Sequence, residues 1–352
     1  MKKILFIDKT QLGLTTDCIK YCEYLQDKYE IRFLCFDMGK PKVNVPNIKV
    51  TYVPRFGNLM VRGITFILYA IINVLFFNGF IFVFNFPKCS ILKRILFWKN
   101  MHIDIRTLAV YPDKAMRKAY DSQLEKDISY FDSSSFISKG IQQKMSLPQY
   151  KKTFILPLGA DVLSTTDKSF ETMQLLYVGT LSNRHIIDTV KGYIEFIKAN
   201  PNIVSHYDII GDGESNELSE IETYIKEAQM EKYITLHGRL PYSSLKPFFD
   251  SHNIGISYVP MTDYFDYQPP TKTFEYILSG ILCLATSTNA NREIIIPQNG
   301  ILHQDTSTSF KETLEMVAQN LNQYNSKTVR DTLLDYQWRN IIEKYLLPII
   351  NQ

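Results

Sequence analysis

One segment of the chain combines residues suited to hold a negatively charged ligand. Pro269 and Pro270 stiffen a loop that leads into a helix predicted to begin at Thr271. The first amides of a helix lack acceptors within it, and the helix dipole attracts anions to that end. Lys272 in the first turn adds a mobile positive charge, and Glu275 presents a carboxylate from the same end. These groups suit the phosphates and the ribose hydroxyls of a nucleotide.

Simpler interpretations of these two side chains stay open. A capping box needs Ser or Thr three residues before the acid, and that position holds Lys272. The helix dipole alone nevertheless favours an acid in a first turn, so a structural role for Glu275 is an alternative. A lone lysine is by default a surface residue. The position of Lys272 between the proline loop and Glu275 favours a ligand-binding role over that default.

A second anion-binding loop is predicted where an earlier buried strand ends in glycine. The strand Leu175–Val178 is followed by Gly179 and Thr180, whose backbone amides would lie near a phosphate. Arg184 can reach the same charge, the alternative being an exposed loop arginine. Gly211 ends another strand in the same way, although glycine after a strand often only makes a turn.

The first half of the chain offers weaker candidates. Gly13 follows the first strand in the loop Lys9–Leu14, as an ordinary turn glycine also would. Asp104 and Arg106 end a later strand on one side of it, and strand alternation places His102 with them. Asp104 and Arg106 are candidates for sugar or acceptor contacts, with a salt-bridged structural pair as the alternative.

Apolar runs typical of buried parallel strands alternate with helical patterns, which predicts an α/β fold with two doubly wound parallel sheets. The predicted strands are Ile4–Ile7, Ile31–Phe36, Ile48–Val53, Phe80–Phe84, Met101–Ile105, Ser134–Ile137, Thr153–Leu156, Leu175–Val178, Tyr207–Ile210, Tyr233–Leu236, Ile254–Tyr258, Ile281–Ala285 and Gly300–Leu302. The polar, aperiodic segment Gly159–Met173 predicts a linker. We therefore expect Rossmann-like domains over residues 1–165 and 166–335, and a C-terminal helix over 336–352 that packs back on the first domain.

Composition and charge indicate a folded, mildly basic protein. Hydrophobic residues make up 45% and charged residues 21% of the 352 residues, which excludes a disordered chain. The net charge of +3 is too small for a nucleic-acid footprint, and no nucleic-acid partner is expected. The five cysteines are interpreted as reduced core residues, which predicts a cytoplasmic protein.

An apolar stretch of transmembrane length, Ile64–Phe86, is interrupted by Asn78 and Gly79, a strong turn signal. It is therefore predicted to contain a helix from about Val61 to Phe77 and then a buried strand. The helix is either part of the core or a surface that lies on the inner face of the plasma membrane. Several basic residues in this half of the chain suit an anionic membrane surface.

The segment around Lys272 resembles the donor-binding motif P-x-K-x-x-E-Y-x-x-x-G of retaining GT-B glycosyltransferases of the family 4 type, the glycosyl transferases group 1. The matching residues are Pro270, Lys272, Glu275, Tyr276 and Gly280. The resemblance implies that Glu275 binds the ribose and that the amides of Thr271 to Thr273 face the diphosphate. Many members carry an earlier Glu that touches the donor sugar. Tyr267 stands at that place here, and Asp266 is the expected substitute.

The same resemblance extends to the other loops and to the reaction. It implies that Arg184, with Lys272, neutralises the leaving diphosphate, and that Gly13, Gly179, Thr180 and Gly211 adjoin it. The backbone at Arg239 and Leu240 is expected to contact the nucleobase. The implied fold is GT-B, two Rossmann-like domains facing a central cleft with the donor on the C-terminal one.

The implied reaction is transfer of a sugar from a UDP- or GDP-linked donor, with retention and with neither a metal nor a further cofactor. The implied acceptor is a hydroxyl of a glycan or lipid-linked glycan in capsule, O-antigen or exopolysaccharide synthesis. Two alternatives stay open. A sugar-nucleotide epimerase shares the fold, and a non-catalytic binding protein of the same fold would explain the missing first Glu.

Overall fold

The computed structural model describes residues 1–148, 150–213 and 215–352 and divides into two α/β units. Unit 1 comprises Met1–Leu158 and Trp338–Gln352, and unit 2 comprises Gly159–Gln337. The predicted boundaries were 165/166 and 335/336. The structure divides the chain after Leu158 and after Gln337, and an isolated parallel bridge joins Ala160 to Gln337 within unit 2.

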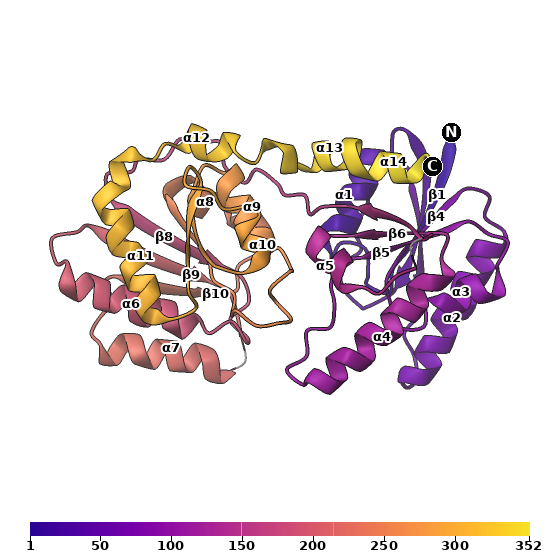
Figure 1. Cartoon of the computed structure of the whole chain (residues 1–352), viewed down its shortest axis with the longest axis horizontal. Helices are drawn as coiled ribbons and strands as arrows, with labels where there is room; N and C mark the ends of the chain where they lie inside the picture. Colours follow the sequence, from indigo (N-terminus) through magenta and orange to yellow (C-terminus); the bar gives the residue numbers. More distant parts are fainter. Residues whose placement is uncertain (149, 214) are drawn as a thin grey trace. The chain divides into compact units, whose positions relative to one another are not determined.

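Over the described residues, unit 1 is built on a seven-stranded parallel sheet in the order β3-β2-β1-β4-β5-β6-β7 (Figure 1). Its strands are β1 Lys2–Ile7, β2 Tyr29–Phe36, β3 Ile48–Val53, β4 Phe80–Phe84, β5 Met101–Ile105, β6 Ser133–Phe136 and β7 Lys152–Ile155. Its helices are α1 Thr16–Leu25, α2 Leu59–Leu75, α3 Ser90–Ile95, α4 Lys114–Tyr130, α5 Lys139–Lys144 and, after unit 2, α13 Trp338–Ile341, the π-helical turn η4 Ile342–Leu346 and α14 Leu347–Ile350. The strand order reverses between β1 and β4. In open α/β sheets, ligands bind outside the carboxyl ends of the strands at such a switch point.

Unit 2 repeats this architecture with a six-stranded parallel sheet across its described residues, in the order β10-β9-β8-β11-β12-β13. Its strands are β8 Met173–Val178, β9 Ser205–Ile210, β10 Ile234–Gly238, β11 Ile254–Ser257, β12 Leu282–Thr286 and β13 Gly300–His303. Its helices are α6 Ile186–Ala199, α7 Ser215–Glu227, α8 Lys246–Ser251, α9 Thr271–Leu278, α10 Asn289–Arg292, α11 Ser307–Asn320 and α12 Ser326–Asp331, with 3₁₀ turns η1 Tyr242–Ser244, η2 Leu321–Gln323 and η3 Leu334–Tyr336. The switch point of this sheet lies between β8 and β11.

The sheet of unit 2 is buried on both faces, which is why its strands read as continuous apolar runs. Helices α6, α7 and α11 bury side chains such as Tyr193 and Phe310 on one face. On the other face, the ring of Tyr276 from α9 lies against Gly255 of β11. A Cβ at Gly255 would stand 2.4 Å from that ring, so glycine is what lets α9 approach the sheet.

The predicted apolar helix is present as α2, which begins at Leu59 and ends at Leu75. It buries Phe66, Ala70 and Val74 against unit 1 and leaves other apolar side chains exposed. No helix in the described ranges combines the length and the apolar character needed to cross a bilayer.

The C-terminal segment closes unit 1 beside α1 (Figure 1). Trp338 is 1% exposed, and its ring meets that of Tyr21 edge to face at 6.0 Å. At the end of the chain, the side-chain amide of Gln352 donates to the hydroxyl of Ser133 on β6. The C-terminal helices therefore contribute to the core of unit 1 through Trp338 and Ile349, and the exposed Gln352 is tied to the sheet.

Candidate functional site

Two cationic side chains meet at the switch point of unit 2. The ammonium of Lys272 lies 3.8 Å from the centroid of the Tyr177 ring, and the guanidinium of Arg184 lies 4.2 Å from that of Phe265. Burial lowers the pKa of Lys272 to about 7, and the positive charge of Arg184 acts in the same direction. Both side chains are only partly exposed. Two cations that repel each other in this way favour an anionic ligand between them.

The loops beside these cations are stacked through glycine. The amide of Gly179 donates to the carbonyl of Ile210, and the amide of Gly211 donates to the carbonyl of Gly238 at 2.8 Å. A Cβ at Gly211 would stand 1.8 Å from the carbonyl oxygen of Gly179. The hydroxyl of Tyr177 also donates to the carbonyl of Thr180 at 2.6 Å. The loops after β8, β9 and β10 are therefore fixed at one edge of the sheet, where they present backbone groups rather than side chains.

Helix α9 begins at the same edge with an open N-terminus. Pro270 stands at the N-cap, and its ring carries no hydrogen-bond acceptor for the first amides. Thr273 differs from the two residues before it, because its amide donates to the carbonyl of Pro270. Its buried hydroxyl lies 2.6 Å from that of Ser257. Of the three amides predicted to face a diphosphate, those of Thr271 and Lys272 are therefore the better donors.

Glu275, one turn into α9, already has a hydroxyl partner. The phenol of Tyr242 donates to Oε1 of Glu275 at 3.2 Å and lies 3.4 Å from Oδ2 of Asp161. Burial raises the pKa of Glu275 to about 7, and the charge of Asp161 acts in the same direction. A hydroxyl-bearing ligand can replace the phenol at this carboxyl, which is the chemistry of ribose recognition.

Sequence reasoning missed the aromatic residues that hold the site. Tyr177 and Phe265 support the two cations, and Tyr242 contacts Glu275, yet no spacing in the sequence marks them. Tyr276 lies within the recognised motif. Its role is structural, since the amide of Val178 donates to its hydroxyl at 2.8 Å and so ties β8 to α9.

The remaining candidates of unit 2 have protein partners. Arg239 is exposed after β10, with Nη1 3.2 Å from Oδ2 of Asp212, and Leu240 beside it is half-buried. Asp266 accepts two hydrogen bonds from Asn289, one from the amide at 2.7 Å and one from the side chain at 2.5 Å. Its carboxylate therefore fixes the start of α10.

In unit 1, Asp104 and Arg106 take part in a buried polar network. Nε of Arg106 lies 3.8 Å from Oδ2 of Asp104, and Nη2 lies 2.5 Å from Oδ2 of Asp17. The hydroxyl of Ser135 donates to Asp104 and lies 2.8 Å from Nε2 of His102. Asp104 is fully buried, so this geometry favours the salt-bridged structural pair over a sugar contact. Burial explains the raised pKa of Asp104, about 6, and the lowered pKa of His102, about 3.

Gly13 lies exposed after β1, as predicted for the loop Lys9–Leu14. Its φ of 98° is in the left-handed region, and a Cβ there would stand 2.3 Å from Val43. The turn alone thus requires glycine, which leaves a contact with a diphosphate as a prediction.

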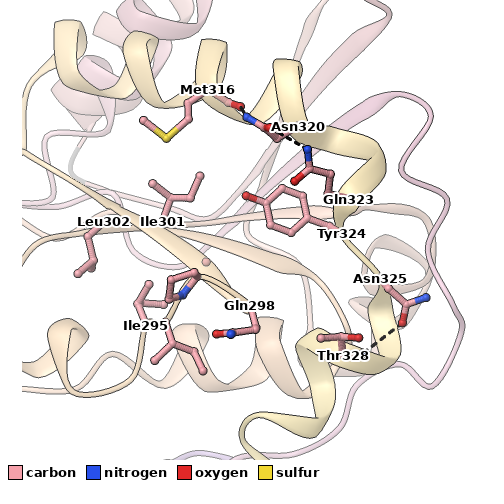
Figure 2. A pocket seen from close by; sticks show the side chains of 13 residues that line it. Ile295, Gln298, Ile301, Leu302, Met316, Asn320, Gln323, Tyr324, Asn325 and Thr328 are labelled. Carbon is pink, nitrogen blue, oxygen red and sulfur yellow. Dashed lines mark hydrogen bonds between the residues drawn. The ribbon is translucent and has the colours of Figure 1, made fainter.

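A separate cavity of about 600 Å³ lies on the edge strand β13 of unit 2 (Figure 2). Figure 2 shows Met316, Asn320 and Tyr324 along one side of it and Ile295 and Gln298 along the other. All of its lining side chains are uncharged. Because a diphosphate needs positive partners, this cavity is not suited to the phosphates of a nucleotide.

Comparison with known proteins agrees with this geometry. Residues 172–320 match the family model described as Glycosyl transferases group 1. No curated protein sequence gives a significant match. Among solved structures, sucrose-phosphate synthase from Thermosynechococcus elongatus superposes with a TM-score of 0.77 at 13% identity, covering 100% of this chain and 99% of that chain.

Two further structures span the whole fold. HepE of Anabaena, solved in complex with UDP and glucose, has a TM-score of 0.76 at 12% identity and covers 100% of both chains. The lipopolysaccharide outer core galactosyltransferase WaaB has a TM-score of 0.74 at 16% identity and covers 99% of both chains. These solved structures share the two-domain GT-B fold with this chain, which confirms the predicted fold class. The predicted resemblance to the glycosyl transferases group 1 is confirmed for residues 172–320, and the family 4 type stays a prediction.

Proposed function

We propose that this protein is a glycosyltransferase of the family 4 type that transfers a sugar from a UDP- or GDP-linked donor bound by unit 2. The observation that carries the proposal is the convergence of Lys272 and Arg184 beside the open start of α9, with Glu275 one turn further along the same helix. This arrangement offers positive charge to a diphosphate and a carboxylate to a ribose. The similarity to HepE, which was solved with UDP and glucose bound, supports a donor of this kind.

Each predicted contact has a role in this proposal. Backbone amides bind the diphosphate, and the loops after β10 contact the base. The diphosphate contacts are Gly13, Gly179, Thr180, Gly211, Thr271 and, less directly, Thr273; the base contacts are Arg239 and Leu240. Asp266 is the proposed sugar-side carboxylate, which requires the donor sugar to share it with Asn289.

Catalysis in this proposal is electrostatic. Arg184 and Lys272 stabilise the charge that develops on the departing diphosphate, in a site whose donors are fixed before the donor binds. The acceptor hydroxyl attacks the face that the diphosphate leaves, so the anomeric configuration is retained. Because the two cations and the amides of α9 neutralise the phosphates, we propose a reaction without a metal or a further cofactor.

We further propose a glycan or lipid-linked glycan as acceptor, in the synthesis of a capsule, an O-antigen or an exopolysaccharide, by a cytoplasmic protein in peripheral contact with the membrane. The resemblance to a lipopolysaccharide galactosyltransferase and the apolar surface of α2 support this assignment. Asp104 and Arg106 act in it by shaping the carboxyl edge of unit 1 rather than by touching the acceptor, since Asp104 is buried.

Nucleotide binding by purified variants tests the donor site. The affinity for UDP and GDP, measured by calorimetry, should fall about 10- to 100-fold in Glu275→Ala and in Arg184→Ala, because each change removes a charge-assisted contact worth about 1.5–3 kcal/mol. Glu312→Ala and Lys327→Ala, on exposed faces of α11 and α12, are matched controls and should bind normally. Unchanged affinity in both site variants would refute the placement of the donor.

Turnover separates the proposed enzyme from its alternatives. Slow hydrolysis of a nucleotide sugar to free sugar and nucleotide would support a transferase. If EDTA leaves the rate of this hydrolysis unchanged, the reaction needs no metal. Conversion of the nucleotide sugar to its epimer would identify an epimerase, and binding without any turnover would identify a binding protein.

A further inference from the structure

Helices α2 and α3 of unit 1 enclose an apolar groove of about 410 Å³. It is lined by Gly63, Ile64, Ile67 and Ile71 of α2 and by Ile91 and Ile95 of α3, among other apolar residues. Its charged lining residues are Lys9 and Lys88. The lining of the groove is thus mostly apolar, with positive charge at Lys9 and Lys88.

The two lysines lie at one end of the groove. Lys9 follows β1 and Lys88 follows β4, the strands on either side of the switch point of unit 1. Because α2 and α3 each connect parallel strands, both run away from the carboxyl edge of the sheet, so Ile71 and Ile95 mark the opposite end. The lysines therefore stand at the edge where ligands of open α/β sheets bind.

The lysine pair faces the groove without an acidic partner among the described lining residues. Nζ of Lys9 lies 5.3 Å from the centroid of the Phe86 ring. Burial lowers the pKa of Lys9, and the positive charge of Lys88, which lines the same groove, acts in the same direction. A bound anion would relieve both effects.

The surface around the groove is suited to lipid. On α2, the groove-lining Ile64 and Leu68 are 52% and 53% exposed, and Ile72 beyond them is 57% exposed. Just after α3, Phe97 and Trp98 are exposed by 72% and 58%. Exposed aliphatic side chains beside an exposed tryptophan are typical of a protein surface at a membrane–water interface.

We propose that this groove binds a lipid phosphate, with the hydrocarbon chain between α2 and α3 and the phosphate at Lys9 and Lys88. The charge complementarity of the lysine pair selects a phosphate-bearing lipid over a neutral one. The proposal rests on the proposed function and makes it more specific, because it defines the acceptor as a lipid that carries its glycan through a phosphate. The head group then lies at the carboxyl edge of unit 1.

Gly63 allows the groove to be filled without disturbing the helix. A Cβ at this position meets no atom within 4 Å, so Gly63→Phe should fold and place its ring in the groove. Gly63→Ala is the matched control. The probe is decyl phosphate below its micelle concentration, compared by calorimetry with inorganic phosphate and with decanol.

The full-length protein should bind decyl phosphate at least about 10-fold more tightly than either half-probe. Gly63→Phe should abolish this binding, whereas Gly63→Ala should preserve it. Lys9→Gln and Lys88→Gln should each weaken it about 10-fold, because each removes a charge-assisted contact, while Lys49→Gln on the edge strand β3 should not. Equal binding of decyl phosphate by Gly63→Phe and the unmodified protein would overturn the proposal.

Affinity for UDP, measured on the same samples, keeps the two proposals separate. Loss of decyl phosphate binding with UDP binding intact is the expected result for Gly63→Phe. A protein that binds UDP but never decyl phosphate refutes the lipid site alone, and one that binds decyl phosphate but no nucleotide refutes the donor site alone. One further outcome would refute the groove as the lipid site. If the protein adsorbs to anionic vesicles equally with and without Gly63→Phe, and binds no monomeric decyl phosphate, its membrane contact is a general charge attraction.

Discussion

The ammonium of Lys272 lies over the face of the Tyr177 ring, 3.8 Å from its centroid. Tyr177 is fixed in turn, because its hydroxyl donates to the carbonyl of Thr180 in the loop after β8. An aromatic face attracts a cation that burial has partly stripped of water. Lys272 is therefore held beside the loop that follows β8.

Nucleotide affinity should depend on the protonation of Lys272. Its pKa is lowered to about 7, so the free protein loses this charge as pH rises from 6 to 8, and UDP binding should weaken over that range. Glu275, with its pKa raised to about 7, gains charge over the same range and favours ribose, so the series is best measured in Glu275→Gln. Calorimetry from pH 6 to 8.5 checks this. Lys272→Arg should remove the part of the pH dependence of UDP affinity that Lys272 causes. The titration of the UDP phosphates is the same for both proteins and therefore cancels when they are compared.

The unliganded protein should gain stability when Lys272 is made neutral. The pKa of this lysine is about 10.4 when unfolded and about 7 when folded, so the unfolded chain binds more protons between these values. The free energy of unfolding thus rises with pH across this window, and the penalty is full below pH 7. Lys272→Met should stabilise the fold by about 1–2 kcal/mol at pH 7, measured by denaturant unfolding. Lys327→Met on exposed α12 is the control, and a destabilised Lys272→Met protein would contradict the prediction.

Gly211→Ala should disrupt the stacked loops of unit 2. Its Cβ would stand 1.8 Å from the carbonyl oxygen of Gly179, and backbone cannot move aside cheaply. We expect a loss of about 1–3 kcal/mol in stability and at least a 10-fold weaker affinity for UDP. Thermal unfolding with and without UDP measures both. Gly63→Ala, where a Cβ meets no atom within 4 Å, should instead leave UDP binding unchanged.

Trp338→Ala should destabilise unit 1 without altering the donor site. The side chain is 1% exposed and packs on Tyr21, and truncation of a buried tryptophan costs about 3–5 kcal/mol. Hydrogen exchange should therefore rise across β1 and α1, while UDP binding by unit 2 persists. Leu334→Ala, at a side chain that is 40% exposed, is the control. Equal exchange in the two variants would show that Trp338 does not stabilise unit 1.

The sequence predicted the strands well because most lie between two covered faces, so runs such as Leu282–Thr286 are apolar and bounded by turn signals. Lys272 and Arg184 could be expected to meet, since both follow strands whose carboxyl ends share one edge. Other environments depend on distant partners that spacing does not encode. Asn289 accounts for the geometry of Asp266, and Asp17 for that of Arg106. The structure divides the chain after Leu158 and after Gln337, next to a bridge between Ala160 and Gln337 that sequence spacing does not encode.

The chain leaves unit 1 after Leu158 and supplies the rest of that unit only from Trp338 onward. During synthesis, unit 2 therefore emerges from the ribosome before unit 1 is complete. Until the segment from Trp338 is made, the surface of α1 that receives this tryptophan stays open to water and to chaperones. A stop codon just before Trp338 would thus leave unit 2 whole and unit 1 without the segment that covers α1.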